Sequence, residues 1–367
     1  MTMSKNRKRK TEIQLQSNQD DTLMKNTKVN ITKPGDSRVL KLVHEILPEL
    51  KENQVLIETE ACGVAFADIM MREGLYPNVP RKNITPGYDI VGKVIAKGLD
   101  VTAFSADDRV AGLIRTGGYA KYAVVESSQI INCPKHIPAG HVVAMILNYT
   151  TAYQMLTRIA RVKPGDNILV HGAAGGVGSA LIDIATSLDL KIYCTLSDRK
   201  WQDIPARFIK IGAVNRINYQ SAPFEKTLSK IAPRGMDAVF DPIGGKHLKR
   251  SYEVLSPGGQ VVSYGFSTAI KNGRRNLLSI LKALIQSVLL PSKMITDCKS
   301  VAGFDIWTMA QQRPEYFKED LEAIFNLYQE GKIAPVMAKS FSLEDAAKAQ
   351  DLMATSELAG KITLVMS

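Results

Sequence analysis

The sequence predicts an α/β fold in which a compact β-rich unit is joined to a doubly wound parallel sheet. Three observations support this class: short apolar runs separated by Gly, Pro and Asp before residue 133, strand and helix patterns that alternate after residue 166, and a glycine-rich turn where the alternation starts. Alternating strands and helices are typical of parallel sheets with helices on both faces. The chain has 367 residues, of which 45% are hydrophobic, so each unit can bury a core of its own.

The first 25 residues are polar and carry a basic cluster from Lys5 to Lys10. They contain no apolar run of signal-peptide length, so we expect a disordered tail, with Met24 as an alternative start of the chain. A solvated tail is the plain interpretation of the cluster, and a nuclear address or a nucleic-acid tether is the alternative.

Charge and cysteine content narrow the class of protein further. The formal net charge of +11 is compatible with nucleic-acid binding, but the basic residues are mostly scattered and no recognised nucleic-acid module is present, so we expect no specific nucleic-acid partner. The four cysteines lie at 62, 133, 194 and 298 without a C-x-x-C pair. This spacing favours neither a disulfide framework nor a zinc lobe, and it fits a reducing, cytoplasmic setting.

Short strand-like runs follow one another between residues 29 and 132. They include QVLIETEACGV, DIVGKVIAKG and GGYAKYAVVE, separated by turns rich in Gly, Pro and Asp. Two stretches, GVAFADIMMREGLYP at 63–77 and TPGYDIVGKV at 85–94, interrupt these strands with loops. Because loops carry chemistry more often than strands do, we expect these two stretches to face a cleft.

The stretch from 167 to 190, NILVHGAAGGVGSALIDIATSLDL, predicts a strand, a tight turn and a one-faced helix. Ile168–Val170 is an apolar run of the kind that a buried parallel strand needs, and apolar residues recur at helical spacing after Val177. The three glycine places of a G-x-G-x-x-G spacing are held by Ala173, Gly175 and Gly178. A glycine-rich loop before a core helix is the plain alternative, but strand, turn and helix occur in the order that a dinucleotide-binding site requires.

A helix that follows directly from a strand points its unpaired N–H groups and the positive end of its dipole into the turn. A pyrophosphate fits there only where small residues let its oxygens approach the backbone, which is why positions 173, 175 and 176 need alanine or glycine. The turn therefore predicts a bound dinucleotide.

The next strand, Lys191–Leu196, bears on the choice between NAD and NADP. NAD-binding folds place a carboxylate about 20 residues past the glycines to bind the ribose 2′-hydroxyl. Here Ser197 stands at that place. Asp198 follows, but the cations Arg199 and Lys200 stand beside it. A hydroxyl and two cations suit a 2′-phosphate, so we predict NADPH, while a solvated basic turn without a coenzyme contact is the alternative.

Further patterns complete the alternation of strands and helices. A helical spacing at 138–158 would bridge the two units, and helices are expected at 316–329 and 343–355. Strands are expected in NRINY, MDAVFDPIGG, GGQVVSYGF and KSVAGFDI. The apolar segment from Arg274 to Met294 is too short and too interrupted to span a bilayer, so a helix that covers the cleft or a partner subunit is the plain interpretation, with peripheral membrane contact as the alternative.

The closing run GKITLVM reads as a strand at the extreme end of the chain. We expect it to join a sheet formed earlier, which makes the first domain discontinuous. The predicted division is a basic tail at 1–25, a catalytic domain made of 26–148 and 307–367, and a nucleotide-binding domain at 149–306.

A series of collinear motifs makes the chain resemble the medium-chain dehydrogenase/reductase superfamily. They are GVAFADIMMREGLYP, PGYDIVGKV, GGYAKYAVV, NYTTAYQML, HGAAGGVG, FDPIGG, VVSYGF and GKITLVM. Within the superfamily the chain is similar to the zinc-free quinone oxidoreductase branch, which includes the synaptic vesicle membrane protein homologues. The resemblance covers residues 25–367 and implies a GroES-like catalytic domain, a Rossmann domain, NADPH, and a homodimer joined through the sheet edge near Val261–Phe266.

Position by position, the resemblance implies coenzyme contacts along the Rossmann domain and at its rim. They fall on Thr151, Ala174, Gly175, Gly176, Val177, Ser197, Arg199, Lys200, Tyr219, Gly265 and Phe266, with Lys361 as a weaker assignment. Thr151 would lie close to the nicotinamide end of the coenzyme.

Zinc-dependent members of the superfamily carry a cysteine where this chain has Ala65 and a histidine where it has Tyr88. A methyl group and a phenol are poor zinc ligands beside a thiolate and an imidazole, so we expect no catalytic metal. Without a Lewis acid, hydride can still reach an acceptor that is already electrophilic, such as a quinone or an α,β-unsaturated ketone.

Tyr76 in GLYP is the candidate catalytic residue by its place in the resemblance, as a hydrogen-bond donor to the oxygen that gains charge. A tyrosine packed at a loop end with its hydroxyl in water is the alternative. The branch usually has asparagine at the position of Ala65, so a donor and an acceptor near the nicotinamide are missing. We predict an NADPH-dependent, zinc-independent quinone or enone oxidoreductase, with an NADPH-binding interaction protein at a membrane surface as the alternative.

Overall fold

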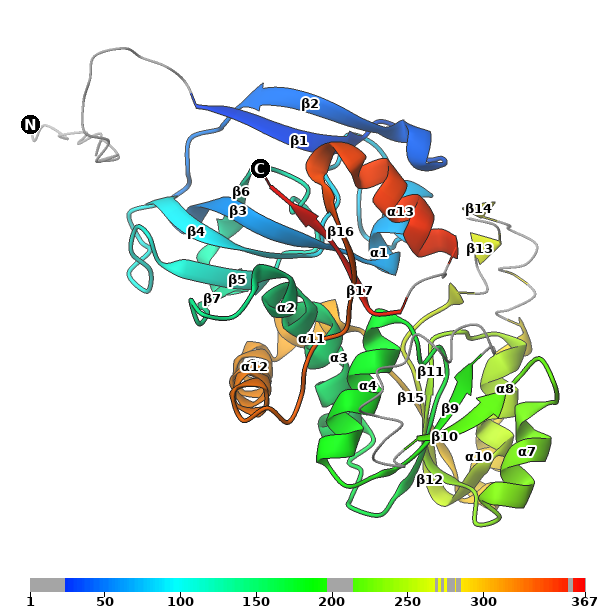
Figure 1. The fold of residues 1–367 in the computed structure, drawn as a ribbon. Coiled ribbons are helices and arrows are strands. Elements are labelled where there is room, and N and C mark those ends of the chain that lie inside the picture. Colours follow the sequence, from blue (N-terminus) through cyan, green and yellow to red (C-terminus); the bar gives the residue numbers. More distant parts are fainter. Residues whose placement is uncertain are drawn as a thin grey trace, which may run out of the picture.

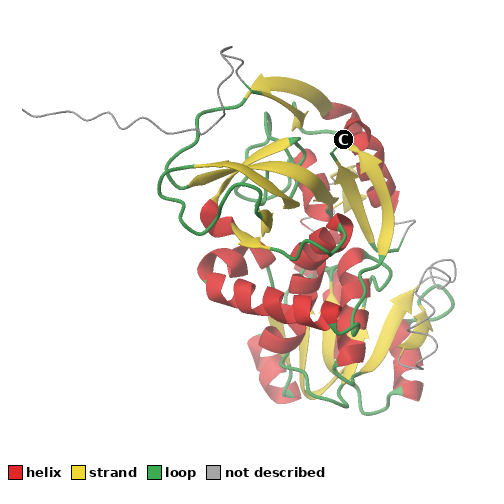
Figure 2. Cartoon of the chain, turned by 60° about the vertical axis from the view of Figure 1, so that its left-hand side comes forward, coloured by secondary structure: helices red, strands yellow, loops and turns green. Residues whose placement is uncertain are grey.

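The computed structural model describes residues 24–196, 214–267, 270–271, 274–275, 281, 285–355 and 359–366. Two large sheets organise this part of the chain, one in an upper β-rich domain and one in a lower domain where helices surround a parallel sheet (Figure 1). Figure 2 shows most helices around the lower sheet and between the domains. The predicted α/β class, a β-rich domain with a doubly wound parallel sheet, is confirmed.

The β-rich domain is built on a seven-stranded sheet in the order β16-β17-β3-β4-β5-β7, with β6 paired to β3, and a two-stranded ribbon β1-β2 lies beside it. Strand β3 is central and almost wholly buried, because β4 pairs with one edge and β6 and β17 pair with the other. The strands are β1 Lys25–Ile31, β2 Leu40–Ile46, β3 Gln54–Val64, β4 Asp89–Lys97, β5 Arg109–Leu113, β6 Tyr122–Glu126, β7 Ile130–Asn132, β16 Met337–Ser342 and β17 Lys361–Val365.

The closing strand β17 returns to the sheet in which the chain began. Ile362 pairs with Val64 and Val365 pairs with Ala61 in an antiparallel ladder, while β16 runs parallel on the other side of β17. The β-rich domain therefore contains both the first and the last strands of the described chain.

The lower sheet has six parallel strands in the order β10-β9-β8-β11-β12-β15. Short apolar runs form them because both faces are covered by helices. Their bounds are β8 Asn167–Val170, β9 Lys191–Leu196, β10 Val214–Asn218, β11 Met236–Asp241, β12 Leu255–Ser263 and β15 Ser300–Gly303. The predicted sheet edge near Val261–Phe266 is wrong, because β12 pairs with both β11 and β15, and β15 is the strand at that edge.

One helical stretch joins the domains, at the place predicted for the bridging helix. It begins after Pro138 and runs through α2 Ala139–Ala144, the π-helical turn η3 Met145–Tyr149, α3 Thr150–Gln154 and the π-helical turn η4 Met155–Ile159. The remaining helices are η1 Ser37–Val39, α1 Phe66–Arg72, η2 Ser127–Gln129, α4 Gly176–Ser187, α7 Phe224–Ile231, α8 Lys246–Glu253, α10 Pro291–Asp297, α11 Ile306–Gln312, α12 Pro314–Gln329, η6 Leu343–Asp345 and α13 Ala346–Thr355.

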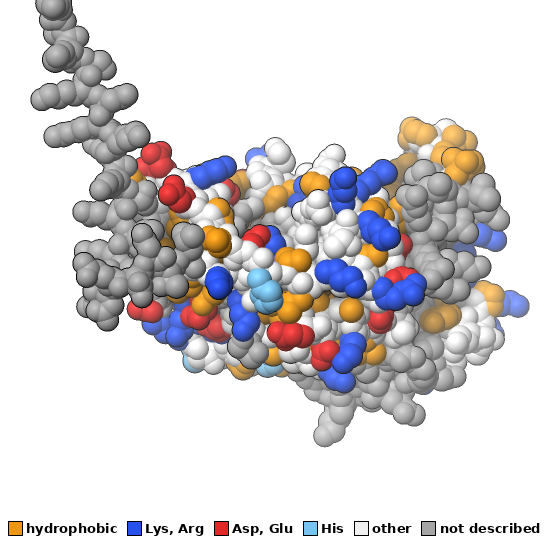
Figure 3. Space-filling view, turned by 90° about the horizontal axis from the view of Figure 1, so that it is seen from above, with side chains coloured by type: hydrophobic (Ala, Val, Ile, Leu, Met, Phe, Trp, Pro, Cys, Tyr) orange, Lys and Arg blue, Asp and Glu red, His pale blue; other side chains and the backbone are white. Residues whose placement is uncertain are grey.

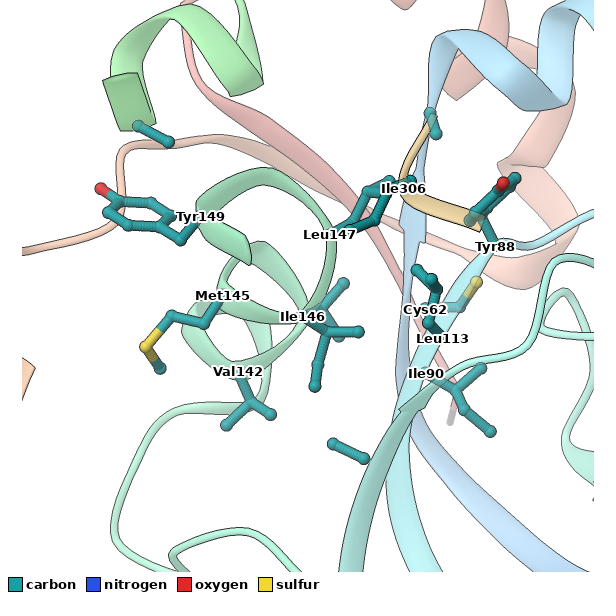
Figure 4. Packing of buried hydrophobic residues seen from close by; sticks show 14 of the residues in the cluster. Cys62, Tyr88, Ile90, Leu113, Val142, Met145, Ile146, Leu147, Tyr149 and Ile306 are labelled. Atoms are coloured by element: carbon teal, nitrogen blue, oxygen red, sulfur yellow. The ribbon is translucent and has the colours of Figure 1, made fainter. Parts of the chain in front are cut away.

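The helical stretch packs directly on the β-rich domain. Figure 4 shows Ile146 pointing toward Ile90 and Leu113, while Leu147 points toward Ile306 and lies near Tyr88. All of these residues belong to one buried cluster that continues from the upper sheet into the lower one. The two domains therefore share a continuous core, which fixes the helical stretch between them.

The apolar segment 274–294 differs from the single helix that was predicted. Its first residues, Arg274–Arg275, form strand β14, which pairs with β13 Ile270–Lys271, and its last residues begin α10 at Pro291. Proline suits the first turn of a helix, where its missing N–H group loses no bond, so a new helix begins there. No described helix is both long enough and apolar enough to cross a bilayer.

A buried ion pair fastens β17 to the upper sheet. Lys361 Nζ lies 2.7 Å from Asp89 Oδ2, and the side chains of Lys361 and Asp89 are 2% and 0% exposed. Burial raises the pKa of Asp89, and the nearby Lys361 ammonium opposes that rise. Gly63 donates its N–H to the same carboxylate at 3.0 Å, so both charges are held in fixed positions.

Removing the cation alone should destabilise the protein strongly. Lys361→Met leaves the Asp89 carboxyl group buried without its partner, which typically lowers the free energy of unfolding by about 3–5 kcal/mol. Urea denaturation followed by circular dichroism measures this loss. The double variant Lys361→Met/Asp89→Asn should recover part of it, and a single variant as stable as the unmodified protein would contradict the assignment.

Candidate functional site

The glycine turn at the end of β8 is a candidate anion-binding loop. Gly172 has a positive φ of +63°, and Gly175 donates its N–H to Gly172 O at 2.9 Å before α4 begins at Gly176. The bond from Ser179 N to Gly175 O is 2.8 Å long. This is the first hydrogen bond of the helical ladder. The N–H groups of residues 176–178 come before it and have no acceptor within the helix, so they are available to a bound anion.

Close packing explains why small residues occupy this turn. A side chain at Gly178 would collide with the backbone of Gly172 and Ala173, so the helix can approach the strand only without one. Gly175 is exposed, and a methyl group there would meet only Gly172 O, at 3.3 Å. The exposed glycine therefore faces the space that a phosphate would occupy, while Gly178 serves helix packing.

The turn is also tied to the closing strand of the other domain. Gly360 N donates to Ala174 O at 3.0 Å, and Gly175 forms a parallel bridge with Gly360. The amide of Asn148, on the helical stretch between the domains, lies where a side chain at Gly176 would be. The candidate phosphate loop is thus contacted by the β-rich domain and by the helical stretch between the domains.

Thr151 carries a polar atom that the described part of the protein leaves unpaired. Its side chain is 5% exposed, and its Oγ1 has no hydrogen-bond partner among the described residues. A buried hydroxyl without a partner is unfavourable unless a ligand satisfies it. Thr151 is therefore suited to a coenzyme group, and with the open amides of the turn it shows that the residues present fit a dinucleotide.

The loop after β11, which we call the second wall of the candidate site, lies at the same end of the parallel sheet as the glycine turn. Asp241 Oδ1 accepts hydrogen bonds from Ile243 N at 2.7 Å and Gly244 N at 3.1 Å, and its Oδ2 accepts from Ser251 Oγ at 2.8 Å and lies 3.0 Å from His247 Nδ1. Burial alone would raise the pKa of Asp241, but His247 and the other donors outweigh it and hold the pKa well below its usual range. The loop is therefore fixed by a charged carboxylate.

The other predicted coenzyme residues are found in three situations. Gly265 packs against Pro242 of the β11 loop, and Phe266 lies beside Gly244, so both border this second wall. Tyr219 follows β10 and is 52% exposed. Ser197, Arg199 and Lys200 lie outside the described residues.

Lys361, the weaker of the predicted coenzyme contacts, has its side chain paired within the protein. Its ammonium is buried in the pair with Asp89, and it offers almost no surface to a coenzyme. The prediction followed the position of Lys361 in the motif GKIT, but the partner comes from β4, far away in the sequence. We assign Lys361 to the stability of the upper sheet.

Tyr76 belongs to an aromatic group with Tyr88 and Trp307. Its hydroxyl is 2.7 Å from the hydroxyl of Tyr88, with the two rings edge to face at 6.1 Å, and Tyr88 packs edge to face on Trp307 at 6.3 Å. The guanidinium carbon of Arg115 lies 5.3 Å from the ring centres of both Tyr76 and Trp307. Figure 4 places Tyr88 near Leu147, on the helical turn that leads toward Thr151.

Two of these residues were not singled out from the sequence as parts of the site. Arg115 lies in the loop after β5 and Trp307 in the first turn of α11, neither of them in a motif of its own, and Tyr88 was noted only as a poor metal ligand. Ala65 is buried at the start of α1, and its methyl side chain has no hydrogen-bond donor. Among the described residues, no three His, Cys, Asp or Glu side chains are grouped so that they could hold a metal ion.

Fold and site together define a two-domain nucleotide-binding protein of the dehydrogenase type. A parallel sheet with an open glycine turn faces a β-rich domain that supplies phenols and a guanidinium, and the two are joined by one helical stretch. Comparison with known proteins identifies the family more closely.

Two family models match the chain. Residues 51–135 match the alcohol dehydrogenase GroES-like domain, and residues 211–364 match the zinc-binding dehydrogenase model. The synaptic vesicle membrane protein VAT-1 homolog of Danio rerio is 31% identical, over 90% of this chain and 68% of that protein. The quinone oxidoreductase of Lama guanicoe is 29% identical, over 92% of this chain and 97% of that protein.

Among solved structures, the quinone oxidoreductase of Escherichia coli, solved in complex with NADPH, superposes with a TM-score of 0.80. The two are 26% identical, and the superposition covers 92% of this chain and 99% of the E. coli chain. The chain therefore belongs to the medium-chain dehydrogenase/reductase superfamily, in the group of VAT-1 homologues and quinone oxidoreductases, and is an oxidoreductase of that fold.

Two glycines of the turn should respond differently to the same substitution. Gly178→Ala forces backbone atoms apart, so we expect a loss of about 1–3 kcal/mol in the free energy of unfolding. Gly175→Ala should keep the stability but weaken NADPH binding about tenfold, because the methyl group lies where the phosphate would approach. Thermal unfolding and titration calorimetry measure the two effects, and equal stability losses would contradict this division.

Proposed function

We propose that the protein is a zinc-independent, NADPH-dependent reductase that transfers hydride to a quinone or an α,β-unsaturated ketone. The observation that carries the proposal is the open glycine turn at the start of α4, next to the unpaired Thr151 hydroxyl. The E. coli relative, which was solved with NADPH, supports the choice of coenzyme. Relatives named quinone oxidoreductase support the class of acceptor.

The bound coenzyme supplies the hydride, and the chain's residues do the rest. The amides of the turn hold the pyrophosphate, and Thr151 pairs with the nicotinamide end. Tyr76 donates a hydrogen bond to the acceptor oxygen as negative charge develops there. In this proposal the acceptor binds between the coenzyme and the Tyr76 phenol, so that hydride and hydrogen bond reach it together.

Neither described group at the metal positions of zinc-dependent relatives is a good zinc ligand. Ala65 has a methyl group, and the Tyr88 phenol is bonded to Tyr76. An acceptor that needs no Lewis acid therefore suits this site best, and quinones and enones have this property because their carbonyl groups withdraw electrons from the carbon that receives hydride.

Enzyme assays test the reaction directly. The purified protein should oxidise NADPH in the presence of 1,4-benzoquinone or 9,10-phenanthrenequinone, and a chelator should leave the rate unchanged. Tyr76→Phe should lower kcat about 100-fold, because an oxyanion loses its donor, while the Kd for NADPH stays the same. Absorbance of NADPH follows the rate, and loss of turnover on chelation with recovery on adding zinc would overturn the proposal.

Preference for the 2′-phosphate is a separate prediction. Arg199 and Lys200 follow the second strand of the parallel sheet, at the place where a 2′-phosphate needs cations. The double variant Arg199→Ala/Lys200→Ala should bind NADPH at least about tenfold more weakly and NADH unchanged, as measured by titration calorimetry. The control variant Lys163→Ala/Lys191→Ala removes the same charge at the opposite end of the strands and should leave NADPH binding unchanged. A similar loss of NADPH affinity in this control would show a general charge effect instead.

We also propose a homodimer joined at β15. This strand pairs only with β12 within the described sheet, and α10 before it carries exposed apolar residues, including Ile295 at 79% exposure. An open strand edge beside apolar surface favours association with a second copy. Figure 3 shows a different face, that of the β-rich domain seen from above, where Lys and Arg side chains are interspersed with Asp and Glu.

Charged substitutions next to β15 should separate the subunits. Leu290→Glu/Ile295→Glu places two carboxylates on the proposed contact, so light scattering should give half the molar mass of the unmodified protein. Leu99→Glu changes an exposed apolar residue of the other domain and should leave the mass unchanged. A monomeric unmodified protein would contradict the proposal, and flotation of that monomer with liposomes would favour a membrane contact for this surface.

A further inference from the structure

The hydroxyl groups of Tyr76 and Tyr88 form a pair with unequal access to solvent. They are 2.7 Å apart, a short hydrogen bond in which either oxygen can be the donor. Tyr88 is 1% exposed, whereas Tyr76 is only partly buried against the core. Of the two, only Tyr76 is therefore accessible to a small molecule from solvent.

Burial decides the direction of the hydrogen bond. Within the described part of the chain, Tyr88 Oη has Tyr76 Oη as its one hydrogen-bond partner. If Tyr88 accepted, its own hydrogen would be buried without an acceptor, which is unfavourable by about 1–3 kcal/mol. Tyr88 therefore donates, and Tyr76 keeps its hydrogen free to donate to an oxygen outside the pair.

The backbone on both sides of Tyr88 fixes the ring in place. Its carbonyl accepts from Ile114 N at 2.9 Å and from Arg115 N at 3.2 Å. Gly87, at φ +110°, donates its N–H to Asp68 Oδ1 at 2.9 Å and leaves no room for a side chain beside Gly118. The Tyr88 hydroxyl is thus held in one position before any acceptor arrives, which removes the need to order it during the reaction.

The pKa of Tyr76 is raised, chiefly by burial, while the groups around its hydroxyl act on that pKa in both directions. Arg115 donates from Nη2 to Pro77 O at 2.6 Å, and this bond holds its cation beside the Tyr76 ring. Burial raises the pKa of Tyr76, while the bond from Tyr88 and the Arg115 charge lower it. Asp305 at the start of α11 and Asp68 on α1 act in the opposite direction. Burial raises the pKa of Asp68 to about 7, so its charge near neutral pH is reduced.

We propose that Tyr88 is a positioning residue that orients Tyr76 and stabilises its oxygen while Tyr76 protonates the reduced acceptor. This inference rests on the proposed reductase function. As hydride bonds to the acceptor carbon, the electron pair of the acceptor's double bond moves to its oxygen, and the Tyr76 O–H bond breaks to give that oxygen a proton. The Tyr76 oxygen then carries the charge, accepts the Tyr88 hydrogen bond, and regains a proton from water.

A double-mutant cycle separates this role from simple packing. Tyr88→Phe removes one oxygen and keeps the ring against Trp307, and it should lower kcat about 5- to 10-fold with KM and NADPH binding unchanged. In the Tyr76→Phe background the same change should have no further effect. Tyr252→Phe removes a buried hydroxyl in the other domain and should leave kcat unchanged. An equal loss from Tyr88→Phe with and without the Tyr76 hydroxyl would overturn the proposal.

A second readout requires no turnover. In protein labelled with fluorotyrosine, the fluorine NMR signal absent from Tyr76→Phe belongs to Tyr76, and its titration midpoint should move to higher pH in Tyr88→Phe, because the ionised oxygen loses a donor. An unchanged midpoint would overturn the proposal. If the unmodified protein binds NADPH but reduces none of the acceptors, the reductase function fails, and the titration still decides whether Tyr88 controls Tyr76.

Discussion

The backbone amides at the start of α4 are the constraint on which this structure depends. A helix cannot pair its first N–H groups, and here they are left open by a turn of small residues instead of being capped by a side chain. The closing strand approaches the same turn through the bond from Gly360 to Ala174, so the β-rich domain is held where it can cover a bound coenzyme.

Local patterns were sufficient to predict the fold and the turn, because glycine spacing, apolar runs and helical periodicity are written in consecutive residues. The sheet edge was not predictable in this way. Whether Val261–Phe266 lies at the edge depends on whether the short run that became β15 pairs beyond it. Likewise, the ends of the apolar segment 274–294 form β14 and a helix that begins at Pro291, because pairing with β13 and the proline outweigh helical spacing.

The site shows the same limit for side chains. Tyr76 could be selected from its motif, but its partner Tyr88 is 12 residues away, and only the folded loops bring the two hydroxyls together. Arg115 and Trp307 have no local signal at all, since their stacking arises from tertiary structure. Lys361 illustrates the reverse case: its place in a motif indicated a coenzyme contact, and only the folded sheet shows that its ammonium pairs with a carboxylate on another strand.

The return of β17 to the first sheet has a consequence for biosynthesis. The N-terminal strands are synthesised long before residues 361–365. Until then one edge of β3 is incompletely paired and Asp89 lacks its cation. The parallel sheet is encoded entirely between these parts and can assemble first. A product that lacks β17 would expose that edge of β3, and an unpaired strand edge favours aggregation.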